Sequence, residues 1–144
     1  MGIFQNPSDR EISELLLHVR TIAVVGLSPR TNRPSHGVAA QMQRFGYRII
    51  PVRPAAESVL GEKAYAALRE VPDKFDLVDV FRAPEYVGEI VEECMALGVP
   101  SIWLQEGVMN IPAAERAREA GMTVVMDRCV YREYLRLFGQ VPHP

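Results

Sequence analysis

Two hydrophobic patterns alternate along the chain. Short apolar runs rich in β-branched residues, of which residues 21–25 (TIAVV) are the first, predict strands that are buried on both faces. Between these runs, apolar residues at helical spacing, such as Val38, Met42 and Phe45, predict amphipathic helices. The predicted strands span residues 21–25, 47–52, 75–81, 101–105 and 123–126, and the predicted helices span residues 8–19, 34–45, 64–70, 84–97, 112–120 and 130–138.

Residues at the element boundaries support this division. Ser8 and Glu11 form a capping box that predicts the start of the N-terminal helix 8–19. Gly46 follows the apolar face of the next predicted helix and suits its C-terminal end. Because strands and helices alternate through short links, we expect an α/β fold with a doubly wound, five-stranded parallel sheet. A chain of 144 residues suits a single domain, residues 1–144.

The composition narrows the class of protein. Hydrophobic residues make up 48% and charged residues 24% of the chain, which is ordinary for a globular protein. Cys94 and Cys129 match no zinc-site spacing and no disulfide framework, so we expect no metal site and a cytoplasmic protein. The N-terminus lacks a signal-peptide pattern and no apolar run reaches the length of a membrane span, so we expect no membrane partner.

The charge is small in total but unevenly distributed. A formal net charge of −2 argues against binding to a nucleic acid. Residues 15–56, however, hold six arginines and no acidic residue, whereas the rest of the chain holds 10 basic and 18 acidic residues. This asymmetry within one domain indicates an anionic small-molecule partner for the basic part.

The loop after residues 21–25 is the strongest candidate site. Ligands bind at the carboxyl ends of parallel strands, and a helix N-terminus offers N–H donors and a favourable dipole to phosphate. Arginine and hydroxyl side chains in this loop add charge-assisted donors. The candidate residues are Gly26, Ser28, Arg30, Arg33, Pro34, Ser35 and His36. The alternative is a solvated loop that leads into a capped helix.

A dinucleotide-binding fingerprint is poorly matched. Of the pattern G-x-G-x-x-G only Gly26 is present, and the strand 47–52 ends in Val52 and Arg53 rather than in an acidic residue. Arg53 offers no acceptor to a ribose hydroxyl, but it suits a terminal phosphate monoester such as that of NADP or coenzyme A (CoA). The alternative for Arg53 is a surface position between two prolines.

The next two strand ends carry further candidates. Phe81 can flank an adenine ring and Arg82 can add a cation, although Phe81 suits the core equally well. Gln105, Glu106 and Gly107 place polar side chains and an open backbone where ligand chemistry takes place.

The last strand end carries Asp127, Arg128 and Cys129. This run suits a polar anchor near a thiol or pantetheine, and a structural Asp–Arg ion pair is the alternative. Trp103 and Cys94 are expected to pack in the core.

Several segments taken together resemble a known family. They are IAVVGLSP (22–29), RPS (33–35), YRIIPV (47–52), DVFR (79–82), WLQEG (103–107) and VMDRC (125–129). In this order they resemble the small stand-alone bacterial CoA-binding proteins, whose domain is similar to the CoA-binding domain of the succinyl-CoA synthetase alpha subunit. The resemblance runs from about residue 20 to residue 134 and implies a Rossmann-like fold with the cofactor across the strand ends.

The resemblance also implies roles for residues. It implies that the first loop cradles the CoA phosphates, through Gly26, Ser28, Arg30, Arg33, Ser35 and His36. Val52 and Arg53 then line the next turn, and Phe81 and Arg82 line the adenine side. The synthetase has a catalytic phosphohistidine in a second domain that 144 residues do not contain, so that role is not carried over to His36.

No group in the sequence has an evident catalytic partner. Cys129 is a potential nucleophile, but no histidine is evidently paired with it, and the chain has neither a G-x-S-x-G elbow nor a P-loop. We therefore expect no enzyme, but a non-catalytic module that binds CoA or an acyl-CoA. One alternative is an NADP-dependent oxidoreductase that uses the same arginines. The other is a regulatory or interaction domain whose nucleotide site has decayed.

Overall fold

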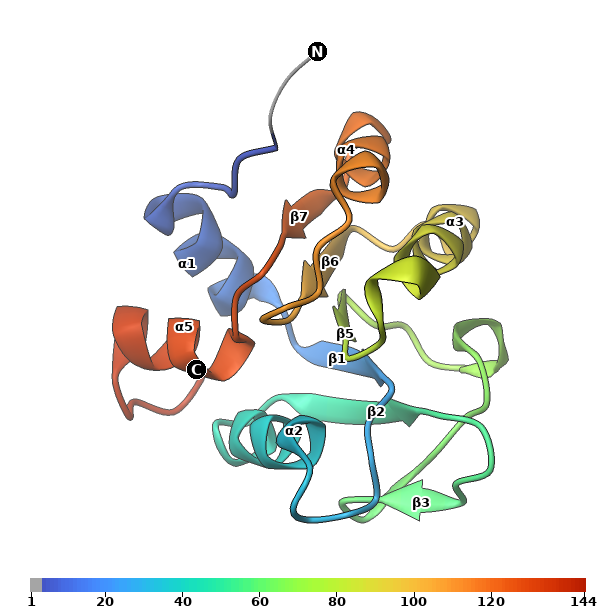
Figure 1. Ribbon diagram of the computed structural model, residues 1–144. Helices are drawn as coiled ribbons and strands as arrows, with labels where there is room; N and C mark the ends of the chain where they lie inside the picture. Colours follow the sequence, from blue (N-terminus) through green and yellow to red (C-terminus); the bar gives the residue numbers. More distant parts are fainter. Residues whose placement is uncertain (1–3) are drawn as a thin grey trace.

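A five-stranded parallel sheet forms the centre of the computed structural model, which describes residues 4–144 (Figure 1). Its strands lie in the order β2-β1-β5-β6-β7. They are β1 (Thr21–Val25), β2 (Arg48–Val52), β5 (Leu77–Val80), β6 (Ser101–Leu104) and β7 (Thr123–Val125). The helices are α1 (Asp9–His18), α2 (Pro34–Arg44), α3 (Val87–Leu97), α4 (Ile111–Glu119) and α5 (Val130–Phe138).

Helices cover both faces of this sheet. Helices α3 and α4 lie on one face, whereas α1, α2 and α5 lie on the other (Figure 1). All the strands pair in parallel, and β1 lies between β2 and β5. The predicted doubly wound α/β fold with a five-stranded parallel sheet is therefore confirmed.

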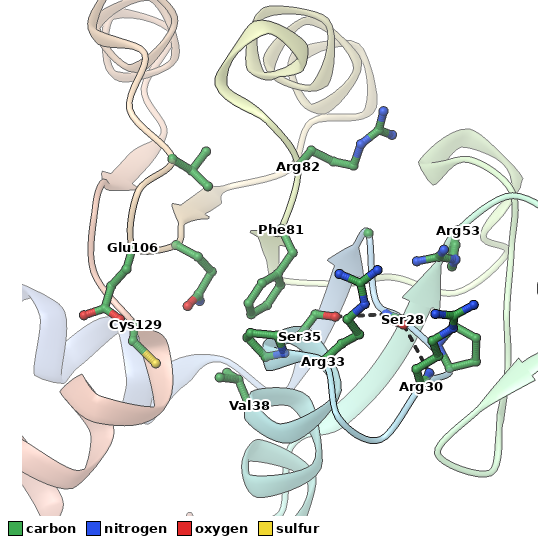
Figure 2. A pocket seen from close by; sticks show the side chains of 15 residues that line it. Ser28, Arg30, Arg33, Ser35, Val38, Arg53, Phe81, Arg82, Glu106 and Cys129 are labelled. Atoms are coloured by element: carbon green, nitrogen blue, oxygen red, sulfur yellow. Dashed lines mark hydrogen bonds between the residues drawn. The ribbon is translucent and has the colours of Figure 1, made fainter.

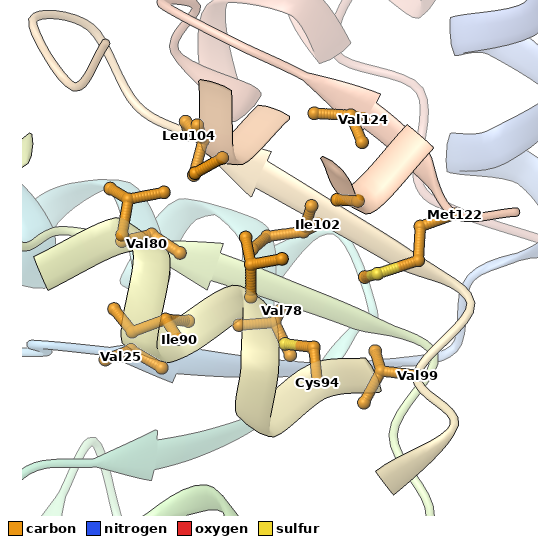
Figure 3. Packing of buried hydrophobic residues seen from close by; sticks show 14 of the residues in the cluster. Val25, Val78, Val80, Ile90, Cys94, Val99, Ile102, Leu104, Met122 and Val124 are labelled. Atoms are coloured by element: carbon orange, nitrogen blue, oxygen red, sulfur yellow. The ribbon is translucent and has the colours of Figure 1, made fainter. Parts of the chain in front are cut away.

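Alternate residues of each strand face the two helical layers. In β1, Ala23 packs in the cluster beneath α3 and α4, whereas Val24 packs in the cluster beneath α1, α2 and α5. Cys94 of α3 belongs to the first cluster (Figure 3) and Trp103 of β6 to the second. Both side chains are fully buried, which confirms their predicted place in the core. Burial on both faces explains why these strands read as continuous apolar runs.

Helix α1 begins with the predicted capping box. The backbone N–H of Glu11 donates to Ser8 Oγ, and the Glu11 carboxylate accepts from the backbone N–H of Ser8. The helix packs against α5, so the N-terminal segment completes one helical layer. Within residues 4–144, no helix is long and apolar enough to cross a membrane.

The prediction of a helix over residues 64–70 is wrong. The segment between β2 and β5 instead forms a short antiparallel hairpin of β3 (Ser58–Val59) and β4 (Glu62–Lys63). A single 3₁₀ turn, η1 (Leu68–Glu70), is all that remains of the predicted helix. Strand and helix therefore do not alternate strictly along the whole chain.

The physical reason lies in backbone pairing at the edge of β2. The N–H of Tyr65 donates to the carbonyl of Pro51 at 3.0 Å, and the carbonyl of Tyr65 accepts from the N–H of Arg53 at 2.7 Å. Backbone groups used in this parallel bridge are not available to a helix. The bridge also holds the backbone of Arg53 in place at the end of β2.

Candidate functional site

A cavity of about 730 Å³ opens above the carboxyl ends of β1, β5 and β6 (Figure 2). Its walls come from the loop after β1, the start of α2, and the turns that follow β2, β5, β6 and β7. The predicted site residues that line it are Gly26, Ser28, Arg30, Arg33, Pro34, Ser35, Arg53, Phe81, Arg82, Gln105, Glu106 and Cys129. The fold thus brings together most of the predicted residues from turns that are far apart in the sequence.

Gly26 makes room for neighbouring backbone, whereas the resemblance implied that it contacts the phosphates of a ligand. Its φ is +86°, and a Cβ at this position would lie 2.4 Å from the carbonyl oxygen of Phe81. Its N–H donates to the carbonyl of Val52 at 2.9 Å. The missing side chain therefore makes room for the chain's own backbone, and it allows the ends of β1, β2 and β5 to meet beneath the cavity.

The serine hydroxyls of the first loop shape the loop itself. The N–H of Ser28 donates to Ser35 Oγ at 3.0 Å, and the N–H of Arg30 donates to Ser28 Oγ at 3.1 Å. Both serines are buried. Because each hydroxyl oxygen accepts from the backbone, each hydroxyl hydrogen is left to donate to an anion in the cavity.

Helix α2 begins at this loop without a side-chain cap. Its N-cap residue is Arg33 and its first residue is Pro34, and no side chain of residues 4–144 caps it. Ser8 caps α1 and Asn110 caps α4, whereas the N-cap residues of α3 and α5, like that of α2, make no capping hydrogen bond. Pro34 has no N–H, and the N–H groups of His36 and Gly37 donate to the carbonyl of Arg33. The start of α2 therefore offers the cavity mainly the positive end of the helix dipole.

Arginines without acidic partners surround this part of the cavity. They are Arg30, Arg33, Arg53 and Arg82, and we call this part the arginine half. Within residues 4–144, none of these guanidinium groups forms an ion pair. Arg82 instead lies over the ring of Tyr86, 4.0 Å from its centroid. Unpaired guanidinium groups beside a helix N-terminus attract phosphate strongly.

The opposite part of the cavity carries little unbalanced charge, and we call it the neutral half. It consists of Gln105, Glu106 and Cys129, with Asp79 beneath them. The carboxylate of Glu106 is paired with Arg132 at 2.9 Å. Gln105 is buried, and its Nε2 donates to Asp79 Oδ1 at 2.6 Å.

Phe81 lies between the two halves. Figure 2 shows Arg53 on one side of its ring and Glu106 and Cys129 on the other. The side chain is partly buried, lines the cavity and also packs against the core cluster beneath α1, α2 and α5. Both expectations for Phe81, a ligand contact and a core position, therefore describe part of its surroundings.

Burial shifts the titration of two groups in the neutral half. It raises the pKa of Asp79 to about 7, although the hydrogen bond from Gln105 acts in the opposite direction. Burial also raises the pKa of the Cys129 thiol, while the backbone N–H groups of Arg132 and Tyr131 lower it. A thiol with a raised pKa stays protonated at neutral pH, so Cys129 is a poor nucleophile.

Several predicted site residues lie outside this cavity. They are His36, Val52, Gly107, Asp127 and Arg128. Asp127 Oδ1 accepts from the N–H of Gly107 at 2.8 Å, whereas Arg128 pairs with Glu133 at 3.1 Å. Asp127 and Arg128 thus stabilise two separate parts of the β7–α5 corner. The Asp–Arg ion pair considered as an alternative does not form, because each residue has a different partner.

A second cavity, of about 520 Å³, adjoins the arginine half. It shares Gly26, Arg53 and Arg82 with the first cavity, and Val52 lines it. Its other walls are mainly apolar, including Leu68, but the α3 side also carries the carboxylates of Glu89 and Glu93. Within residues 4–144, no three His, Cys, Asp or Glu side chains come together in a way that suits a metal ion.

Sequence reasoning missed some residues of the site. Pro29, Val38 and Val108 line the cavity. Val38 lies on the apolar face of α2, where the periodicity indicated only core packing. Asp79 was not singled out either, although an acidic residue inside the apolar run 75–81 was the available signal, since a buried carboxylate needs a partner.

Comparisons with known proteins identify a family and relatives for this chain. The chain matches the CoA binding domain family over residues 20–134. It is 44% identical over 126 residues to the uncharacterized protein YneT of Bacillus subtilis, which covers 88% of this chain and 93% of that protein. The solved structure of a hypothetical protein from Pyrococcus horikoshii OT3 has a TM-score of 0.89 and 36% identity, and the match covers 96% of this chain and 100% of that chain. Relatives therefore occur in both a bacterium and an archaeon.

A larger protein also contains a similar segment. The ADP-forming acetate–CoA ligase II of Archaeoglobus fulgidus is 27% identical over 86 residues, which span 58% of this chain but only 13% of the ligase. Since the family match extends over most of the chain and includes every turn that lines the cavity, this chain belongs to the CoA binding domain family.

Proposed function

We propose that this chain binds coenzyme A or an acyl-CoA as a stand-alone module and carries out no chemistry on it. The observation that carries the proposal is the arginine half, where Arg30, Arg33, Arg53 and Arg82 line one cavity with the uncapped start of α2 and form no ion pair within residues 4–144. Membership of the CoA binding domain family supports the same ligand.

The two halves of the cavity suit the two ends of this ligand. Coenzyme A carries a diphosphate and a 3′-phosphate at one end, and a neutral pantetheine arm with a terminal thiol at the other. Phosphates interact best with guanidinium groups and helix N-termini, which the arginine half provides. The neutral arm has no need of cations, and it suits the neutral half.

The adjoining cavity offers a place for the adenine ring. Its apolar walls, including Leu68, lie directly beyond Arg53 and Arg82, which border both cavities. A base placed there leaves the 3′-phosphate beside Arg53. The ligand then passes over Gly26, where the ends of β1, β2 and β5 meet, and its diphosphate lies between the two cavities.

The chemistry of the cavity supports binding rather than catalysis. The thiol of Cys129 is held protonated by burial, and the carboxylate of Glu106 is balanced by Arg132. The hydroxyl oxygens of Ser28 and Ser35 accept from the loop backbone. An enzyme of nucleophilic type needs a group with an activating base, and within residues 4–144 these side chains have no such partner.

Calorimetric titration with CoA, NADP and NAD tests the ligand. We expect CoA to bind more tightly than NADP, because only CoA has a long neutral arm for the neutral half. Tighter binding of NADP, together with hydride transfer to a carbonyl substrate, would favour the oxidoreductase alternative. Absence of binding by all three ligands would contradict the proposal and favour a decayed site.

Arg53→Glu tests where the 3′-phosphate lies. The variant should weaken CoA by about 30-fold or more and dephospho-CoA, which lacks that phosphate, by much less, since one good charge-assisted contact is replaced by repulsion. Arg44→Glu is the matched control, because it reverses the same charge at an exposed arginine at the far end of α2 and outside both cavities. Equal losses for the two ligands would refute this assignment of Arg53.

A further inference from the structure

We propose that Gln105 presents a fixed hydrogen-bond acceptor to an amide N–H of the pantetheine arm, and that buried Asp79 is the positioning residue that fixes it. The inference rests on the proposed function and deepens it. It names the part of the ligand that meets the neutral half, and it assigns a role to a residue that does not itself line the cavity.

Asp79 is placed where packing alone favours an apolar side chain. It lies in the middle of β5, between Val24 of β1 and Trp103 of β6, and it is 1% exposed. Within residues 4–144 no basic side chain pairs with it. Burying a carboxyl group without a cation costs stability, so this group needs a purpose other than packing.

The visible effect of Asp79 is on the orientation of Gln105. The Nε2 of Gln105 donates to Asp79 Oδ1 at 2.6 Å. Because Asp79 Oδ1 accepts this hydrogen bond, the amide turns its NH₂ group toward Asp79 and its Oε1 away from it. The backbone of Gln105 is held as well, because its N–H donates to Val80 and its carbonyl accepts from Val108.

This arrangement leaves one polar atom of Gln105 for the cavity. The side chain is 4% exposed and lines the cavity, and within residues 4–144 no donor reaches its Oε1. Because no buried side-chain oxygen or nitrogen in residues 4–144 lacks a hydrogen-bond partner, this Oε1 reaches the cavity surface, where a ligand donor can take the place of water. The neutral half therefore has an acceptor of fixed position.

An acceptor at this place selects the chemistry of its partner. It attracts an N–H or O–H donor, and it repels phosphate and carboxylate oxygens, which also only accept. The pantetheine arm carries two amide N–H groups and no charge, and the neighbouring cavity residues Val38, Val108 and Cys129 suit its methylene groups. Gln105 thereby fixes the direction of the ligand, with the arm in the neutral half and the phosphates in the arginine half.

Calorimetry with two ligands tests this role. We compare CoA with adenosine 3′,5′-bisphosphate, which has the nucleotide part but no arm. Gln105→Leu and Asp79→Leu should each weaken CoA by about 5- to 10-fold and leave the bisphosphate within about twofold, as expected for one lost hydrogen bond. Asp79→Asn keeps a carbonyl oxygen that accepts from Gln105 Nε2, so it should recover most of the affinity that Asp79→Leu loses.

Ser101→Ala is the matched control. It removes another hydrogen bond of a buried side chain, from Ser101 Oγ to the carbonyl of Asp76, but at the opposite end of the sheet. It should lower stability without changing the ratio of the two affinities. Circular dichroism confirms that each variant is folded, and Asp79→Asn keeps the test informative if a leucine variant is not.

The outcomes separate this inference from the proposed function. Equal losses for CoA and the bisphosphate in Gln105→Leu would show a general structural role and would overturn the inference. If the wild-type protein binds both ligands equally, the arm makes no useful contact, and the inference fails while the proposed function stands. If neither ligand binds, the proposed function fails and the inference fails with it.

Discussion

The arginine half and the neutral half of the cavity differ in whether their charged side chains have partners within the protein. In the arginine half, Arg30, Arg33 and Arg53 have no acidic partner among residues 4–144. In the neutral half, the charge of Glu106 is balanced by Arg132. What separates the half that suits an anion from the half that suits an uncharged group is therefore the absence of internal partners for the charged side chains.

This difference explains how a chain with a small net charge can attract a polyanion. Acidic residues are present throughout the second half of the sequence, and three of them, Glu92, Glu106 and Glu133, pair with arginines of the same half. The first strand–loop–helix unit has no acidic residue of its own. Its arginines at the strand ends stay free for the ligand, and their charge is concentrated on one half of one cavity.

The largest expected effect on stability comes from disrupting the close approach of the ends of β1, β2 and β5 at Gly26, beneath both halves of the cavity. Gly26→Ala places a Cβ 2.4 Å from the Phe81 carbonyl oxygen at a residue with φ of +86°. Strained backbone and overpacking together should destabilise the fold by about 3 to 5 kcal/mol. Urea unfolding measures this loss.

Gly37→Ala is the control for this substitution. Gly37 lies in α2, and a Cβ there would meet no atom within 4 Å. The exchange should be neutral or stabilising by up to about 1 kcal/mol, because alanine favours the helix. If Gly26→Ala lowers the free energy of unfolding no more than Gly37→Ala changes it, the structural role of Gly26 beneath the cavity is contradicted.

The next largest effect concerns Asp79 in the neutral half. Its pKa is raised by burial to about 7, so the folded protein binds an extra proton between roughly pH 4 and pH 7. This contribution to stability is fully present below pH 4 and is lost as the pH rises to about 7. Between pH 5 and pH 7.5 the wild-type protein should therefore lose about 2 to 3 kcal/mol more than Asp79→Asn does. Urea unfolding of both proteins across this range checks the prediction, and parallel pH profiles would contradict it.

The sequence was a good guide to the elements that are buried on both faces. Apolar runs such as 21–25 and 101–105 have no solvent-facing residues, so their strands were readable without tertiary information. Residues 64–70 were misread because their backbone pairs with the edge of β2, a contact that local periodicity does not encode. Long-range pairing of this kind has no signature within a short window of sequence.

The sequence alone indicated where the site lies, but it did not show which part of the site has free arginines and which part has paired charges. Ligand binding at strand ends follows from the predicted topology, and this rule pointed to Ser28, Ser35 and Gln105. The rule does not say which polar residues become partners of one another. Arg128 and Arg53 look alike as arginines near strand ends, and only the position of Glu133 separates them.

A smaller effect tests access to the neutral half. Cys129 lines the cavity, whereas Cys94 is fully buried and burial raises its pKa to about 12. A maleimide should label Cys129 slowly at neutral pH and faster as the pH rises, and leave Cys94 unlabelled in the folded protein. Bound CoA at about 100 times its Kd should slow the labelling about 10-fold or more, because it occupies the cavity. Labelling that is unaffected by CoA would show that the arm does not reach Cys129.

The central claim is that the arginines without partners hold the ligand and the paired ones do not. It is tested most directly by the CoA affinity of two double variants, Arg30→Ala/Arg33→Ala and Arg116→Ala/Arg136→Ala, of which the second removes two arginines that pair with Glu92 and Asp9 away from the cavity. We predict that the first weakens CoA by about 100-fold, because two charge-assisted contacts are lost, and that the second changes it by less than about threefold. Equal losses in the two double variants, or a larger loss in the second, would contradict the account.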